Sequence, residues 1–79
     1  MQYILAFSTT HKVLKAESLL KDSRIKMRLD PAPIKITGHC EIVITLEEEV
    51  LEQALSVLSA HRVHPSAIYR KEEDGYVKV

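Results

Sequence analysis

The most reactive side chain in this sequence belongs to Cys40, the single cysteine. One cysteine cannot form an internal disulfide or a cysteine-rich zinc site, so its chemistry is that of a free thiol. A thiol becomes a better nucleophile when its pKa falls, as it does beside positive charge or the start of a helix. Cys40 is therefore a candidate reactive thiolate. In the alternative interpretation, it shares parity with Ile42 and Ile44 and is a small, inert, buried residue.

Four histidines could assist such a thiolate or bind a metal ion: His11, His39, His61 and His64. Their spacing matches no zinc motif, and histidines scattered in this way are usually surface residues. We therefore expect no metal site and no cofactor. A metal chaperone that uses Cys40 with His39 or His64 stays open as an alternative, which stoichiometric metal in the purified protein would support.

Motifs of other enzyme classes are absent from the sequence. It contains no glycine-rich phosphate loop, Gly-x-Ser-x-Gly turn or His-Glu-x-x-His pair. The acidic run Glu47–Glu49 suits the start of a helix, where carboxylates complement the helix dipole. The basic residues of 24–28 suit a solvated edge strand, because the chain has few aromatic residues on which bases could stack. We expect a carrier or binding protein rather than an enzyme.

The composition limits both size and partners. The chain has 79 residues, with 11 Lys and Arg against 11 Asp and Glu, so its formal net charge is zero. A chain of this length forms one small domain. Without net charge it has no long-range attraction to phosphate backbones or anionic lipids, so we expect neither nucleic acid nor membrane as a partner. The amino terminus lacks the basic start of a signal peptide, and a free thiol suits the reducing cytoplasm.

Hydrophobic periodicity divides the first half of the chain into strands and a helix. Gln2–Phe7 is an apolar run of strand formers, and Thr10–Asp22 has apolar residues at helical spacing. Ile25–Leu29 alternates apolar with basic residues, which predicts a second strand. Prolines make Asp30–His39 a predicted loop, because proline cannot donate to a strand ladder.

The second half repeats this organisation. Glu41–Leu46 is rich in β-branched residues and predicts a third strand. Thr45 followed by Glu48 matches a capping box, which would begin a second helix. Ala67–Arg70 is the predicted fourth strand, and Asp74–Gly75 is a hairpin signal that would add a short ribbon.

The order β-α-β-β-α-β predicts a ferredoxin-like α+β sandwich, in which two helices cover one face of a four-stranded antiparallel sheet with strand order 4-1-3-2. The domain would span residues 1–70, and residues 71–79 would form a tail or hairpin strand. The first strand is apolar on both sides, with Leu5 and Phe7 on one and Ile4 and Ala6 on the other. The face without helices would then need a cover, which predicts a homodimer.

This topology places the candidate thiol. The third strand runs antiparallel beside the first, so its start lies at the end of the sheet where the first strand ends. Cys40 is then expected near the helix start, where Ser8, Thr9 and Thr10 are helix-capping residue types. The loop with Gly38 and the turn His61–Pro65 belong to the same end. The candidate binding residues around Cys40 are Ser8, Thr9, Thr10, His11, Gly38 and His39.

Several of these features occur together, and in the same order, in a known family. They are an apolar first strand, the Ser8–Leu20 turn and helix, a proline-containing loop, Gly38-His39-Cys40 before the third strand, and a closing Ile68–Arg70 strand. In these features the chain resembles the small bacterial selenium/sulfur carrier protein-like family over most of residues 2–70. Family members commonly have a small residue after the cysteine, where this chain has Glu41.

The resemblance implies a role for Cys40 as the acceptor of sulfur or selenium, held as a persulfide or perselenide. It also implies two partners, a donor of the cysteine-desulfurase type and an acceptor protein. The alternative function is a non-catalytic ferredoxin-like regulatory or protein-interaction module with a structural cysteine, for which a Cys40→Ser change would have little effect.

Overall fold

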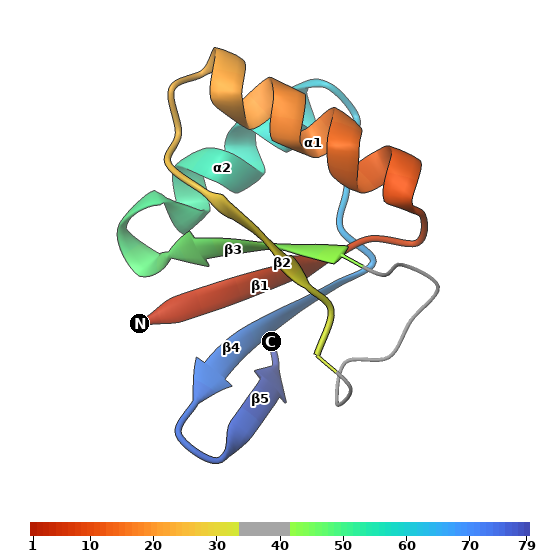
Figure 1. Ribbon diagram of the computed structural model, residues 1–79. Helices are drawn as coiled ribbons and strands as arrows, with labels where there is room; N and C mark the ends of the chain where they lie inside the picture. Colours follow the sequence, from red (N-terminus) through yellow and green to blue (C-terminus); the bar gives the residue numbers. More distant parts are fainter. Residues whose placement is uncertain (34–41) are drawn as a thin grey trace.

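The computed structural model describes residues 1–33 and 42–79, which form two helices and a five-stranded sheet (Figure 1). In chain order these elements are β1 (Gln2–Ala6), α1 (Thr10–Asp22), β2 (Arg28–Pro31), β3 (Ile42–Glu47), α2 (Glu48–Ala60), β4 (Ala67–Glu72) and β5 (Gly75–Lys78). In the described part of the chain, neither helix is long and apolar enough to cross a bilayer.

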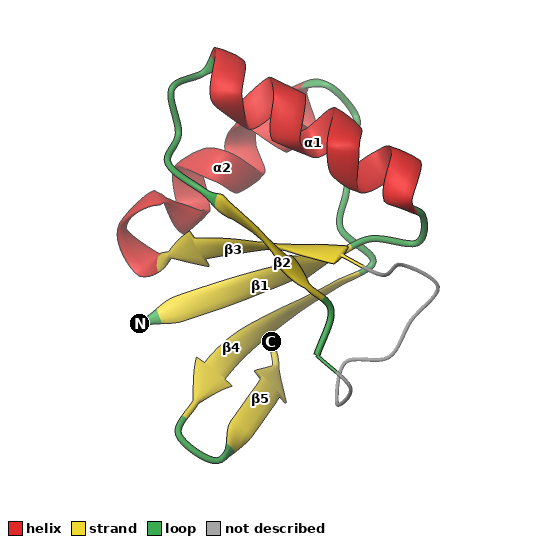
Figure 2. Ribbon diagram, in the orientation of Figure 1, coloured by secondary structure: helices red, strands yellow, loops and turns green. Residues whose placement is uncertain are grey.

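The sheet is antiparallel throughout and has the order β2-β3-β1-β4-β5. Both helices lie on the same side of it (Figure 2). The predicted order 4-1-3-2 is confirmed for the first four strands. The prediction of four strands is wrong, because β5 adds a fifth strand at the edge of β4. β4 also extends beyond the predicted Arg70, and Glu72 pairs with Gly75 across the hairpin.

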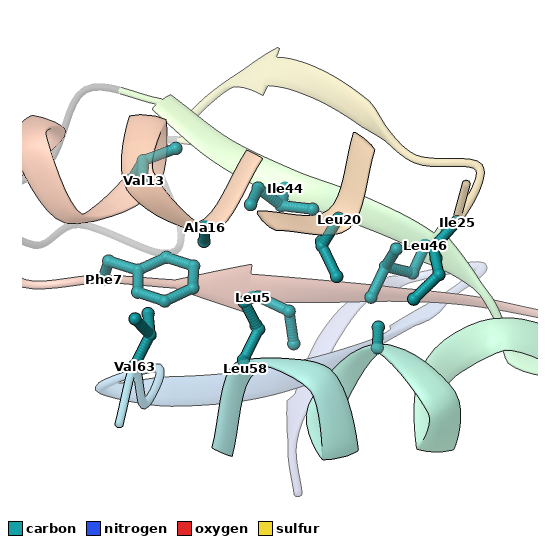
Figure 3. Packing of buried hydrophobic residues seen from close by; sticks show 11 residues of the cluster. Leu5, Phe7, Val13, Ala16, Leu20, Ile25, Ile44, Leu46, Leu58 and Val63 are labelled. Atoms are coloured by element: carbon teal, nitrogen blue, oxygen red, sulfur yellow. The ribbon is translucent and has the colours of Figure 1, made fainter. Parts of the chain in front are cut away.

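The main core lies between the helices and the sheet. Its sheet side includes Leu5, Phe7 and Ile44, and Figure 3 shows these side chains directed toward the helices. The helices contribute their buried residues, which are Val13, Ala16, Leu20, Ala54 and Leu58. These positions recur at helical spacing, so the predicted amphipathic pattern is the one that the core uses.

Both helices end in the same backbone motif. After α1, the Arg24 N–H donates to the carbonyl of Lys21 and the Ile25 N–H donates to that of Leu20, each over 2.9 Å. This is the Schellman pattern, in which the residue after the cap adopts a left-handed conformation. Arg24 has φ 58°. Ile25 is thereby turned into the main core, where it is 5% exposed.

The end of α2 repeats this geometry. Arg62 has φ 60°, its N–H donates to Ser59, and the Val63 N–H donates to Leu58 over 2.9 Å. Val63 is buried in the main core, as Ile25 is. The two motifs bring the chain from each helix back toward the sheet.

The prediction for the second strand is wrong in its bounds. Ile25 and Met27 precede β2 and contact the main core from an irregular segment, whereas Asp30 and Pro31 belong to the strand although they were predicted to be loop. The physical reason is the edge position of β2. Pro31 pairs with Ile42, and an edge strand accommodates a proline because only one side of it needs ladder donors.

The predicted capping box of the second helix is also wrong. Thr45 lies inside β3 and is 5% exposed, while the N-cap of α2 is Glu47, whose side chain makes no capping hydrogen bond. The strand continues because Thr45 pairs with both Ile4 and Arg28. Glu48 and Glu49 occupy the first turn of α2, where their charges complement the helix dipole, as expected for this acidic run.

The sheet face without helices, called the open face below, carries a second apolar cluster. Ile4 and Val43 are 4% and 2% exposed there. They pack with partly buried residues from four segments: Ala6, Ala32, Tyr69 and Tyr76. Ala32 follows β2 and Tyr76 belongs to β5, so residues from both edges of the sheet contact this cluster. The apolar residues that the sequence placed on this face are therefore covered in part by the chain itself.

Candidate functional site

Several predicted site residues fall within the described part of the chain and others do not. Ser8, Thr9, Thr10 and His11 are described. Gly38, His39 and Cys40 lie outside the described residues, as does Glu41. The site can therefore be built from the elements on either side of the cysteine segment, and the placement of Cys40 stays a prediction.

The elements expected around the cysteine segment meet at one end of the sheet. Leu5 pairs with Ile44, so the start of β3 at Ile42 lies beside the end of β1. The turn before β4 meets the same end, because the Ser66 N–H donates to the carbonyl of Ala6 over 2.7 Å. The Ser66 hydroxyl donates to that carbonyl as well, over 3.1 Å. The predicted topology is confirmed for these described elements.

The helix start at this end is well capped. Thr9 is the N-cap of α1, and its hydroxyl accepts from the Lys12 N–H over 3.2 Å. Lys12 Nζ donates to the Ser8 hydroxyl over 3.0 Å, which holds this cation at the end of the helix. No acidic residue occupies the first turn of α1. The helix dipole and Lys12 therefore both contribute positive potential here, and such potential favours an anion.

The three described histidines belong to three different segments of the chain. His11 is exposed on α1, and His61 is the C-cap of α2, with its Nδ1 3.1 Å from the carbonyl oxygen of Val57. His64 is exposed in the turn before β4. Within residues 1–33 and 42–79, no three His, Cys, Asp or Glu side chains gather closely enough to hold a metal ion.

A polar cluster on the open face was missed by the sequence analysis. The buried Thr45 hydroxyl donates to Asp30 Oδ2 over 2.6 Å, and Arg28 Nε lies 2.9 Å from both carboxylate oxygens of Asp30. Two wrong predictions hid the cluster, because Asp30 was assigned to a loop and Thr45 to a helix cap. The usable signal was the alternation of Arg28 and Asp30, which continues the strand pattern past the proline.

The charge of Asp30 depends on these partners. Partial burial by itself raises the pKa of the Asp30 carboxyl. The hydrogen bonds from Thr45 and Arg28, with the positive charges of Arg28 and Lys71, outweigh that effect. The pKa of Asp30 consequently lies below its ordinary value, and the carboxylate is ionised at neutral pH.

Comparison with known proteins gives one family. The family described as "Putative Se/S carrier protein-like" matches residues 2–70 of the chain. No curated protein and no solved structure matches it. The matched range contains β1 through most of β4 and includes the cysteine segment.

Proposed function

Because the chain belongs to the Se/S carrier protein-like family, we propose that it carries sulfur or selenium on Cys40. The observation that supports this proposal is the family match over residues 2–70, a range that contains the single cysteine of the chain. The chalcogen would be held as a persulfide or perselenide. No other residue in this chain has a thiol that could hold it in that form.

The transfer step is a thiolate exchange. The Cys40 thiolate attacks the outer sulfur of a persulfide on the donor enzyme, forming a new sulfur–sulfur bond. The sulfur–sulfur bond of the donor breaks, and its cysteine leaves as a thiolate with the electron pair of that bond. One sulfur atom has then moved to Cys40 without net oxidation, and the selenium reaction has the same balance.

The geometry of the described residues is compatible with this chemistry. β3 begins two positions after Cys40 in the sequence and starts beside the end of β1, which leads into the helix start with Thr9 and Lys12. Positive potential lowers the pKa of a nearby thiol, and a thiolate is the form that attacks. We propose that Ser8, Thr9, Thr10 and His11 form the environment of the thiolate.

The proposal includes partners and a location. The donor is an enzyme of the cysteine-desulfurase type, and an acceptor protein takes the chalcogen onward. Both reactions require a reduced thiol, which suits the cytoplasm. We propose in addition that the protein acts as a homodimer.

The function is tested by the turnover of a cysteine desulfurase without added reductant. Such an enzyme releases alanine from L-cysteine and keeps the sulfur as a persulfide, which blocks further turnover until an acceptor removes it. We expect the reduced protein to raise the amount of alanine released, in proportion to the protein added. Cys40→Ser is the control and is expected to give no increase.

Two results would count against the proposal. Equal stimulation by the wild type and Cys40→Ser would show that the effect does not use the thiol. No stimulation by the wild type, in an assay in which a small thiol does stimulate the enzyme, would show that Cys40 does not accept sulfur from this donor class.

A further inference from the structure

The open face contains a hollow that the proposed carrier chemistry does not use. It has a volume of about 220 Å³ and is lined by residues from all five strands. Ile4 and Val43 line it from β1 and β3, while Tyr76 lines it from β5. The other lining residues are the polar Gln2, Arg28, Asp30, Thr45 and Lys71 and the prolines Pro31 and Pro33.

One side of the hollow carries a fixed carboxylate. Asp30 is held in place by Thr45 and Arg28, through the contacts of 2.6 Å and 2.9 Å described above. Its side chain remains 30% exposed. An ionised carboxylate has about four acceptor positions, and these two partners use three of them. Asp30 can therefore accept one more hydrogen bond from a donor that enters the hollow.

The lysine that lines the hollow is Lys71. Lys71 is exposed on β4, and it pairs with Tyr76 of β5 across the hairpin. In the described part of the chain it forms no ion pair within 4.0 Å. The positive charge of Lys71 is nevertheless close enough to Asp30 to lower the pKa of that carboxyl. The Lys71 ammonium, without an ion pair among the described residues, and the Asp30 carboxylate thus line the same small space, together with apolar residues.

We propose that this hollow binds a small zwitterion, an α-amino acid with an aliphatic side chain. The ammonium of the ligand donates to Asp30, and its carboxylate pairs with Lys71. The aliphatic side chain packs on Tyr76 and Pro31, the apolar lining residues that keep exposed surface, above the nearly buried Ile4 and Val43. A simple anion would pair with Lys71 but be repelled by Asp30. A simple cation would pair with Asp30 but be repelled by Lys71. The arrangement therefore selects a ligand with both charges.

The test is a titration followed by ¹H–¹⁵N NMR with L-valine and its two singly charged analogues. Isovalerate lacks the ammonium of valine, and isobutylamine lacks the carboxylate. We expect L-valine at millimolar concentrations to shift the signals of residues that line the hollow, and we expect each analogue to bind about tenfold more weakly. Equal binding of valine and isovalerate would overturn the proposal in favour of a plain anion site. No shift with any of the three compounds would also overturn it.

Two variants test the assignment of residues. Lys71→Met is expected to weaken L-valine binding about tenfold, whereas Lys78→Met, which removes an exposed lysine of β5 that does not line the hollow, is expected to leave it unchanged. Asp30→Asn should remove the preference for valine over isovalerate. Equal weakening by the two lysine changes, or a preference unchanged in Asp30→Asn, would contradict the assignment. These results do not depend on Cys40 or on sulfur transfer.

Discussion

Thr45 shows how a single polar residue can organise one face of a sheet. It is the one buried polar side chain within the described residues, and its hydroxyl finds its partner in Asp30 of the neighbouring strand. A buried hydroxyl without a partner is costly, so the pair links β2 to β3 in addition to their backbone bonds. This link depends on the charge of Asp30, which makes it sensitive to pH.

Replacing Thr45 with valine keeps the shape of the side chain and removes the donor. We expect the free energy of unfolding to fall by about 1 kcal/mol, because the partly exposed Asp30 can recover some of its hydrogen bonding from water. Urea denaturation at neutral pH measures the change. Thr45→Ser retains the hydroxyl, so it should keep the acid sensitivity described next even if the lost methyl group lowers its stability.

The lowered pKa of Asp30 predicts a loss of stability in acid. A carboxyl whose pKa is lower in the folded than in the unfolded chain adds stability that is complete above the unfolded-state pKa. That stability is lost as the pH falls through the folded-state pKa. We expect the Asp30 carboxyl signal in ¹³C NMR to titrate below the ordinary value of 3.8 for an aspartate. We also expect its midpoint to rise in Thr45→Val; an unchanged midpoint would show that Thr45 does not hold the charge.

At the residue scale, Cys40 as the nucleophile stays a prediction, and the polar cluster was not predicted. A single cysteine is visible in any sequence, whereas the cluster depends on the register Arg28–Thr45 and Asp30–Val43 between two strands. That register could not be predicted because the prolines after Asp30 favour a loop from Asp30 onward. The edge position of β2, which permits the proline, is a property of the whole sheet.

At the scale of the elements, the two helices end in the same motif, and each ending returns the chain to the sheet. Each helix finishes with an arginine in the left-handed region, followed by an apolar residue that enters the main core. The left-handed conformation is one that glycine adopts more easily than other residues. These motifs could not be predicted, because glycine is the usual marker and arginine occupies the position in both.

The strain at these positions predicts a stabilising substitution. Arg24→Gly should raise the free energy of unfolding by about 0.5–1 kcal/mol, since it removes the β-carbon that disfavours φ 58°. Arg24→Ala is the matched control, because it removes the same charge but retains the β-carbon. Chemical denaturation of both variants decides the matter, and a gain for alanine as large as that for glycine would show that the charge, not the backbone, is responsible.

Helical periodicity predicted the bounds of the first helix more accurately than the strand patterns predicted those of the second strand. The bounds predicted for the first helix, Thr10–Asp22, agree with those of α1, because its apolar stripe and the capping residue types before it point to the same segment. The first and fourth strands were also found. The start of α2 was misplaced because Thr45 satisfied a local capping rule while the sheet required it as a strand residue.

At the scale of the whole molecule, β5 changes the character of the open face. Tyr76 packs with the cluster of Ile4 and Val43, and Ala32 approaches it from the opposite edge. The apolar face from which a homodimer is predicted is therefore partly covered by residues of the same chain. The homodimer stays a prediction, and sedimentation at micromolar concentration measures it directly.

The contribution of β5 to stability can be measured separately. Tyr76→Ala should lower the free energy of unfolding by about 1–2 kcal/mol, because Tyr76 is half-buried against the open-face cluster. Val77 is 44% exposed, so Val77→Ala in the same strand should cost less than about 0.5 kcal/mol. Thermal unfolding of the pair tests whether the hairpin is part of the fold, and equal small losses would indicate that it is not.

The proposed function requires that Cys40 accepts a chalcogen atom. The most direct measurement is the intact mass of the reduced protein after incubation with a cysteine desulfurase and L-cysteine. We predict that the wild type gains one sulfur atom, that a reductant removes it, and that Cys40→Ser gains none. An unchanged mass for the wild type, or an equal gain by Cys40→Ser, would contradict the claim.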